Sequence, residues 1–319
     1  MEDKDIRKIC HENHLFCNKI TRVEGSFNKE IYFIDDKYLI RTSKQSMLNE
    51  QFKFDRIRDL KHVPKIVLSS DQRSMECKIY YIILQYIQGI ELFTKYDDLQ
   101  DQDIYNIGVE IADFLSGLHT IKGEKYDIGH YVPIIPDFDK SWKAGHQKYW
   151  DIIYNGLKDI PLSDNAWKII DLSNDYINKN ISSMDFENGH SLIHNDFHFK
   201  NIIVNKNVFS GVIDWECSQY GEADFDLIHL LHWSLFPPSD ASKMMQLFET
   251  VFIHYMKKSN IPMIEKRLTI YLLEHDCIQI LWSQGKKAEE LLPRIEWWIR
   301  NLEKYIVDLL KLVDTGSFH

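Results

Sequence analysis

The chain has 319 residues, a formal net charge of −10 at neutral pH and 44% hydrophobic residues. This length permits one large domain or two smaller ones, and the negative charge disfavours general nucleic-acid binding, which depends on neutralising phosphates. Five scattered cysteines without a C-x-x-C pair argue against a disulfide framework and favour a reducing compartment. The N-terminal MEDKDIRKIC lacks the apolar core of a signal peptide, and no apolar run reaches membrane-span length, so we expect a cytoplasmic protein without membrane contact.

Alternating apolar and polar residues predict a sheet in the first third of the chain. The expected elements are a helix at 4–14, three strand-like runs within 20–41 separated by turns at 25–28 and 35–36, a helix from about residue 46, and strands at 63–68 and 78–87. Gln88-Gly89 breaks the last of these runs. We place a domain boundary there, which gives an N-terminal lobe of residues 1–87 and a C-terminal lobe of residues 88–319.

Helical periodicity dominates the remainder of the chain. The expected helices span about 104–119, 141–157, 164–183, 239–258, 262–284 and 288–313. One region differs from this pattern, because residues 191–230 contain short apolar runs that are broken by turn residues such as Asn205-Lys206-Asn207. Such runs predict buried strands that end in loops.

The polar residues at the ends of these runs suit phosphoryl transfer. Asp196 follows the first run, Asn201 lies five residues later, and the next strand-like run ends at Asp214. One carboxylate can accept the proton of an attacking hydroxyl, while an amide oxygen and a second carboxylate can hold Mg²⁺. The spacing His-x-Asp-x-x-x-x-Asn, followed by a metal-binding Asp, is also that of the protein-kinase catalytic loop.

Three clusters together resemble the aminoglycoside phosphotransferase-like family, which comprises small-molecule kinases of the protein-kinase-like superfamily. They are HNDFHFKN at 194–201, IDWE at 213–216 and GEADFDL at 221–227. One such cluster is a weak signal, but three in matching order and spacing are specific. The resemblance implies an α+β, two-lobed protein-kinase-like fold, with a small antiparallel-sheet N-terminal lobe and a larger, mostly helical C-terminal lobe.

The resemblance also assigns roles within these clusters. It implies that Asp196 is the catalytic base and that Asn201 and Asp214 are Mg²⁺ ligands. It further implies that His194 and Asp226 brace the loop. The donor would be ATP or GTP, and the residues do not distinguish between them.

The same resemblance puts the nucleotide on the N-terminal lobe. Arg41 stands where the family commonly has a lysine that contacts the nucleotide phosphates, and Glu50 would form an ion pair with it. Backbone groups would complete the site, at Ser26 and Phe27 toward the phosphates and at Gln85 and Ile87 toward the base. An ordinary hairpin, a surface arginine and a helix-start glutamate are the alternative interpretations of these residues.

The acceptor is expected to be a small molecule with a hydroxyl group. In aminoglycoside kinases, acidic and aromatic groups of C-terminal helices line the acceptor pocket, which makes Glu274, Asp276 and Glu296 candidates here; a solvated helix face is the alternative. The acidic charge favours a cationic acceptor such as an aminoglycoside antibiotic, hence a role in antibiotic resistance. A choline- or ethanolamine-type or other metabolite kinase would satisfy the same charge. We expect a monomer or a weak dimer.

Two alternatives belong to other classes of protein. His194, Asp196 and His198 form H-x-D-x-H, a set of donors that suits Zn²⁺ or Fe²⁺ in a metal-dependent hydrolase. That interpretation leaves Asn201 and Asp214 without a role. The other alternative is a catalytically silent protein with a kinase-like fold, which would bind nucleotide without phosphorylating an acceptor.

Overall fold

The computed structural model describes residues 2–23, 30–70, 79–127, 138, 140–237 and 242–315. The chain forms two compact units, and each is described by itself: Met1–Lys95 with Phe199–Glu216, and Tyr96–His198 with Cys217–His319. This division groups residues 199–216 with the N-terminal sheet, whereas the lobes expected from sequence keep them in the C-terminal part. A division by compactness does not test a division by function, so the boundary between functional lobes after residue 87 stays a prediction.

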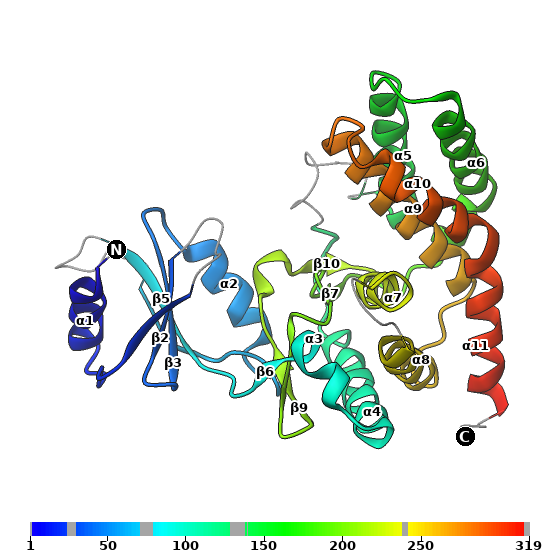
Figure 1. Ribbon diagram of the computed structural model, residues 1–319. Helices are drawn as coiled ribbons and strands as arrows, with labels where there is room; N and C mark the ends of the chain where they lie inside the picture. Colours follow the sequence, from blue (N-terminus) through cyan, green and yellow to red (C-terminus); the bar gives the residue numbers. More distant parts are fainter. Residues whose placement is uncertain are drawn as a thin grey trace. The chain divides into compact units, whose positions relative to one another are not determined.

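The first unit is built on a five-stranded antiparallel sheet (Figure 1). Its strands are β1 (Ile20–Val23), β2 (Glu30–Ile34), β3 (Tyr38–Ser43), β4 (Ile66–Ser70) and β5 (Tyr80–Gln85), in the order β1-β2-β3-β5-β4. The predicted turn at Asp35-Asp36 joins β2 to β3, and both residues have positive φ angles, near 51° and 52°. Asp tolerates this left-handed conformation, which tight hairpin turns require. The turn expected at 25–28 lies outside the described residues.

Alternation along these strands sorts their side chains onto two faces of the sheet. Helix α1 (Asp3–Glu12) covers one face (Figure 1). The buried cluster beneath it contains Ile6, Ile9, Cys10, Tyr32, Ile34, Ile40, Tyr81 and Ile83. The intervening residues Ile31, Phe33, Leu39 and Arg41 line a cavity instead. Helix α2 (Leu48–Ile57) follows β3, close to where the sequence predicts a helix start.

A small three-stranded sheet completes the first unit. It consists of β6 (Ile90–Glu91), β8 (Ile202–Asn205) and β9 (Val208–Val212), in the order β6-β8-β9. A two-residue turn at Lys206-Asn207 joins β8 to β9, with φ angles of 51° and 61°. The predicted turn at 205–207 is therefore present. Helix α3 (Leu92–Lys95) follows β6.

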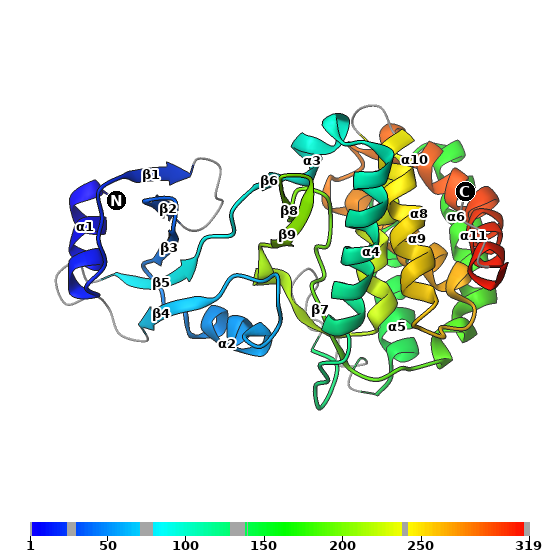
Figure 2. The same cartoon turned by 90° about the horizontal axis from the view of Figure 1, so that it is seen from below.

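The second unit is mostly helical (Figure 2). Its helices are α4 (Asp101–Leu118), α5 (Trp142–Leu157), α6 (Asp164–Asn180), α7 (Leu227–Leu235), α8 (Ser242–Met256), α9 (Ile264–Trp282), α10 (Ala288–Trp297) and α11 (Glu303–Thr315), with short turns η1 (Tyr96–Asp98), η3 (Ile181–Asp185), η5 (Ala223–Asp226) and π-helical η6 (Trp298–Leu302). β7 (Ser191–Ile193) pairs with β10 (Gln219–Gly221), and η4 (Trp215–Cys217) precedes β10.

Sequence periodicity predicts most helices of this unit but not all of them. α4 packs along α8 (Figure 2), and its apolar stripe is buried as expected. The predicted helices omit α7, because its nine residues begin within the segment 191–230, where short apolar runs predict strands. Over the stretches that the structure describes, no helix combines the length and apolar character needed to cross a membrane.

Candidate active site

Asp196 lies just beyond β7, after a left-handed turn. The turn residue is Asn195, with φ near 64°, a conformation that asparagine adopts at lower cost than most residues. The backbone N–H of Asp196 donates to Nδ1 of the fully buried His194 at 3.3 Å. The Asp196 side chain is 26% exposed and borders a cavity of the second unit.

One buried carboxylate holds the backbone that leads to Asp196. The Oδ2 and Oδ1 atoms of Asp226 accept the N–H groups of His194 and Asn195, at 2.9 and 2.8 Å. Nε2 of His119 lies 3.1 Å from the same carboxylate, and its Nδ1 lies 2.8 Å from the Tyr255 hydroxyl. The sequence does not predict this role of His119, because no local pattern at the end of α4 indicates contact with Asp226, 107 positions later.

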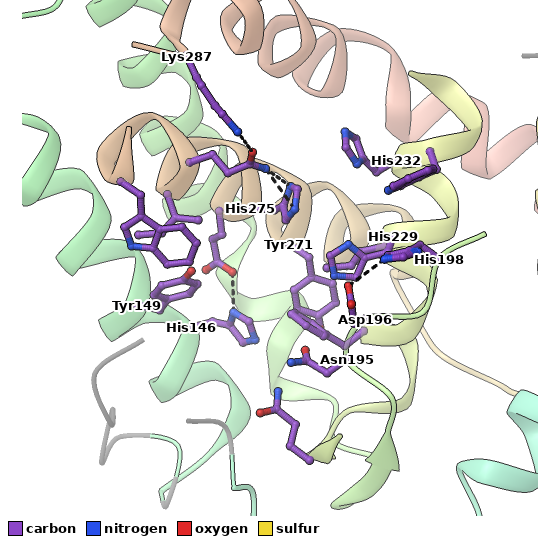
Figure 3. Close-up of a pocket in the computed structure, with 18 of the residues that line it drawn as sticks. His146, Tyr149, Asn195, Asp196, His198, His229, His232, Tyr271, His275 and Lys287 are labelled. Carbon is purple, nitrogen blue, oxygen red and sulfur yellow. Dashed lines mark hydrogen bonds and ion pairs between the residues drawn. The ribbon is translucent and has the colours of Figure 1, made fainter. Parts of the chain in front are cut away.

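The environment of Asp196 keeps its carboxyl group ionised. Burial by itself raises the pKa of Asp196, but the hydrogen bond and charge of His198, with smaller effects of His229 and His194, outweigh burial and lower it to about 2. His198 Nε2 lies 3.5 Å from Asp196 Oδ1 (Figure 3), and the His198 ring stacks on Trp233. Asp196 is therefore a carboxylate at physiological pH, well suited to accept a hydrogen bond but only weakly basic.

The acidic residues of the segment 221–227 are buried and paired within the second unit. Asp224 accepts two hydrogen bonds from the fully buried Arg267, Nε to Oδ2 at 2.5 Å and Nη2 to Oδ1 at 3.0 Å. Glu222 accepts the Tyr126 hydroxyl, and burial raises the pKa of Glu222 to about 7 although this hydrogen bond lowers it. The acidic residues of the segment 221–227 therefore make structural contacts within the second unit.

Asn201 and Asp214 meet at one end of the β8–β9 hairpin in the first unit. They flank the paired residues Ile202 and Val212, and the Ile213 N–H donates to the Asn201 carbonyl at 2.9 Å. Asp214 has φ near 64°, and its side chain is 44% exposed. Amide and carboxylate oxygens are the kind of donors that Mg²⁺ takes together with substrate phosphates.

Arg41 is held by two glutamates of the first unit. Its Nε lies 2.7 Å from Glu50 Oε1, an ionic contact without hydrogen-bond alignment, and its Nη2 lies 2.8 Å from Glu216 Oε2. Nη1 lies 4.0 Å from Asp214 Oδ1, and the Arg41 side chain is only 8% exposed. Glu216 belongs to the IDWE cluster but had no role in the sequence interpretation. A guanidinium fork can reach two carboxylates at once, which a lysine ammonium does less well.

A cavity of about 520 Å³ adjoins Arg41 within the first unit. Its lining brings together Arg41, Asp214, Gln85 and Ile87 with apolar residues that include Val23, Ile31, Phe33, Leu39, Leu84, Ile203 and Ile213. A mostly apolar cavity with Arg41 and Asp214 near each other in its wall suits a flat base attached to phosphates. Glu50 reaches this site through Arg41, whereas Ser26 and Phe27 lie outside the described residues.

A second cavity, of about 630 Å³, lies within the second unit and includes Asp196 in its wall (Figure 3). Glu274 also lines it, as the sequence suggested for an acceptor-binding residue. Its Oε2 lies 2.7 Å from Nδ1 of His146, and both side chains are 2% exposed. Burial raises the pKa of Glu274, and His146 partly opposes this.

Asp276 and Glu296, the other two acceptor candidates, do not line this cavity. Asp276 is fully buried, and its carboxylate accepts hydrogen bonds from Arg294 at 2.6 and 2.7 Å and from Trp298 at 2.8 Å. Glu296 forms a surface pair with Arg300 one turn later. Through these contacts Asp276 ties α9 to the following helices. A role of Asp276 or Glu296 in acceptor binding stays a prediction.

The H-x-D-x-H segment does not form a metal centre. Among the residues that the structure describes, no three His, Cys, Asp or Glu side chains are arranged to hold a metal ion. His194 is fully buried, and its Nδ1 accepts a backbone N–H of the loop. The hydrolase interpretation therefore has no support from the arrangement of these donors.

Two histidines of the same cavity should make the protein sensitive to acid. Burial, followed by the charge of His275, lowers the pKa of both His229 and His232 to about 3. Between pH 6.5 and 3 the unfolded chain then binds protons that the folded chain does not, so stability falls as the pH falls through this window. Between pH 7.5 and 5 we expect a loss of up to about 2 kcal/mol for each ring, an upper value because both rings keep some solvent contact.

Urea unfolding at pH 7.5 and at pH 5 measures this loss. The double variant His229→Asn and His232→Asn should lose clearly less stability between the two pH values than the unchanged protein. His11→Asn, at an exposed histidine of α1, serves as the matched control and should keep the full loss. An equal loss in the double variant and the control would assign the acid sensitivity to other groups.

Comparisons with known proteins show the family and the fold of this chain. The sequence model of the phosphotransferase enzyme family matches residues 19–249, more than half of the chain. No curated protein matches the chain.

Among solved structures, ADP-bound aminoglycoside phosphotransferase APH(2'')-Ib is 20% identical with a TM-score of 0.63, over 94% of this chain and 98% of that one. The streptomycin–ATP complex of APH(2'')-IIa is 18% identical with a TM-score of 0.62, over 98% and 96% of the two chains. APH(4)-Ia is 14% identical with a TM-score of 0.63, over 94% and 99%.

At these identities the similarity to solved structures shows the fold, and it confirms the predicted α+β kinase-like class. The family match covers all three motif clusters, so the resemblance drawn from them is confirmed as well. The chain therefore belongs to the phosphotransferase enzyme family, among the aminoglycoside phosphotransferase-like proteins.

Proposed function

We propose that this protein is a kinase that transfers the γ-phosphoryl group of ATP or GTP to a hydroxyl group of a small molecule. The observation that carries the proposal is Asp196, a carboxylate kept ionised at the wall of a cavity large enough for a small molecule. Asn201 and Asp214, in the same family motifs, add oxygen donors at one hairpin end. Arg41 adds a cation fixed by two glutamates.

The proposed step conserves atoms and charge. The acceptor oxygen forms a bond to the γ-phosphorus while the bond from this phosphorus to the bridging oxygen breaks, and the nucleoside diphosphate leaves with that electron pair. The hydroxyl proton passes to Asp196 and then to solvent. Because the pKa of Asp196 is about 2, its main contribution before transfer is to orient the hydroxyl by accepting its hydrogen bond.

Asn201 and Asp214 would hold Mg²⁺, which when bound supplies charge neutralisation on the donor phosphates. Arg41 would contact the phosphate tail, since its anchored charge needs no reorganisation as negative charge develops. The backbone at Gln85 and Ile87 would receive the base. Both adenine and guanine fit this proposal, so the donor can be ATP or GTP.

Overall charge points to a cationic acceptor, either an aminoglycoside-type antibiotic or a choline- or ethanolamine-type metabolite. The first would imply antibiotic resistance and the second metabolism, and a cytoplasmic monomer or weak dimer fits both.

A mass-spectrometric screen tests the proposal, with Mg-ATP or Mg-GTP, a panel of charged and uncharged alcohols, and Asp196→Asn as control. A product one phosphoryl group heavier, absent with the control, would support the kinase. Nucleotide binding without product from any acceptor would favour the silent binding protein.

Asp214→Ala is expected to weaken Mg²⁺-dependent binding of ADP by at least about 10–100-fold, the range that even outer-shell partners of a metal contribute. The substitution removes the carboxylate of a half-exposed side chain. Calorimetric titration with ADP, with and without Mg²⁺, measures the effect. Asp59→Ala, at a side chain that is 95% exposed in the same unit, should bind normally. Unchanged Mg²⁺ dependence in Asp214→Ala would remove Asp214 from the metal site.

A further inference from the structure

The cavity beside Asp196 carries little negative charge for a polycation to meet. Within the described part of its wall, the carboxyl groups are those of Asp196 and Glu274, and Glu274 is engaged by His146. A cation, Lys287, stands in the same wall (Figure 3). Aminoglycosides carry several ammonium groups, each of which would need a carboxylate to replace lost hydration.

Aromatic rings are frequent in the rest of the wall. Six of them line the cavity: Phe138, Tyr149, Phe225, Trp233, Tyr271 and Trp282. Trp282 at the end of α9 is 53% exposed, although large apolar side chains of this kind usually gain more by burial. An exposed indole at the wall of a cavity is suited to stack on a ring of a ligand.

Polar but uncharged side chains also line the cavity. They include Asn195, Gln219 and Gln279. His229 and His232 are neutral at physiological pH, because their pKa values are about 3. Neutral donors and acceptors match hydroxyl groups of a ligand.

We propose that this cavity accepts an uncharged alcohol that carries an apolar or aromatic ring system, with hydroxyl groups on a neutral sugar-like portion. This inference rests on the proposed kinase function. It names the acceptor class from the lining of the cavity, which favours a neutral molecule over the cationic acceptor that overall charge suggests. The rings would stack on Trp282 and its aromatic neighbours. Hydroxyl groups would pair with polar side chains of the wall, and one of them would reach Asp196.

The experiment uses 4-methylumbelliferyl β-D-glucoside as the neutral ring-bearing probe. Kanamycin, choline and glucose represent a polycation, a small cation and a neutral sugar without an apolar ring. Binding to the full chain is measured without nucleotide by quenching of tryptophan fluorescence and by calorimetry. We expect the glucoside to bind more tightly than all three other probes. Tighter binding of kanamycin or choline than of the glucoside would overturn the inference.

Two variants localise the binding to this cavity. Trp282→Ala should weaken glucoside binding by about tenfold, while Phe16→Ala, at another exposed aromatic residue, should leave it unchanged. Lys287→Glu should strengthen kanamycin binding, because it replaces the cation of the wall by a carboxylate. An equal affinity for the glucoside in Trp282→Ala would contradict the stacking.

A parallel assay with Mg-ATP separates this inference from the proposed function. Phosphorylated kanamycin together with unbound glucoside would overturn the acceptor class and leave the kinase standing. Glucoside binding that depends on Trp282, without phosphorylation of any acceptor, would keep the cavity's ligand class and overturn the kinase.

Discussion

Replacing Asp196 with asparagine is expected to reduce kcat by about 10²–10⁴-fold while the affinity for Mg-nucleotide stays unchanged. Asparagine keeps the size of the side chain but cannot take up the proton of the acceptor, and its amide would present a second donor to the hydroxyl. The groups proposed to bind nucleotide, Arg41 and Asp214 among them, belong to the other compact unit. Steady-state release of ADP measures kcat, and calorimetry measures nucleotide affinity.

The matched control is Asp185→Asn, at a carboxylate of the same unit whose side chain is 60% exposed. It should retain full turnover. Since the pKa of Asp196 is about 2, any loss of activity of the unchanged protein between pH 7 and 5 should come from groups other than Asp196. Full turnover in Asp196→Asn would remove Asp196 from the proton transfer.

Asp224→Ala is expected to lower the free energy of unfolding by about 3–5 kcal/mol. The substitution leaves the guanidinium of Arg267 buried without the carboxylate that accepts two of its hydrogen bonds. Among the described residues, the partners that remain for this charge are Glu222 at 4.0 Å, two backbone carbonyls and the hydroxyl of Tyr271. Urea unfolding at pH 7.5 measures the change.

A second variant distinguishes an unpaired charge from a simple loss of packing. Replacing both members, Asp224→Leu with Arg267→Met, should recover most of the stability, because apolar residues of similar volume often substitute for a buried ion pair. Asp185→Ala breaks the surface pair with Lys143 and should cost less than about 1 kcal/mol. A double variant as unstable as Asp224→Ala would show that the shape of the pair, and not its charge, matters.

Much of the fold and the motif framework could be predicted from local sequence patterns. Period-two alternation in 20–41 predicts β1 to β3, because a strand with one buried face must alternate. The Asp35-Asp36 and Lys206-Asn207 turns were predictable because few residues tolerate positive φ. The motif spacing put Asn201 and Asp214 at either side of one hairpin, and the hairpin register brings them to the same end. The predicted helices omit α7 because it begins within the segment 191–230, whose short apolar runs predict strands.

Only the tertiary structure decided which charged groups pair and which face a cavity. Arg41 meets Glu216, 175 residues later in the chain, and Arg267 meets Asp224 across 43 residues. Asp276 and Glu274 differ by two positions on α9, yet Asp276 is enclosed by Arg294 and Glu274 lines a cavity. Local periodicity reports which face of an element is buried. It does not report what lies opposite that face, and the partner that packing supplies there decides whether a carboxylate stabilises the fold or meets a ligand.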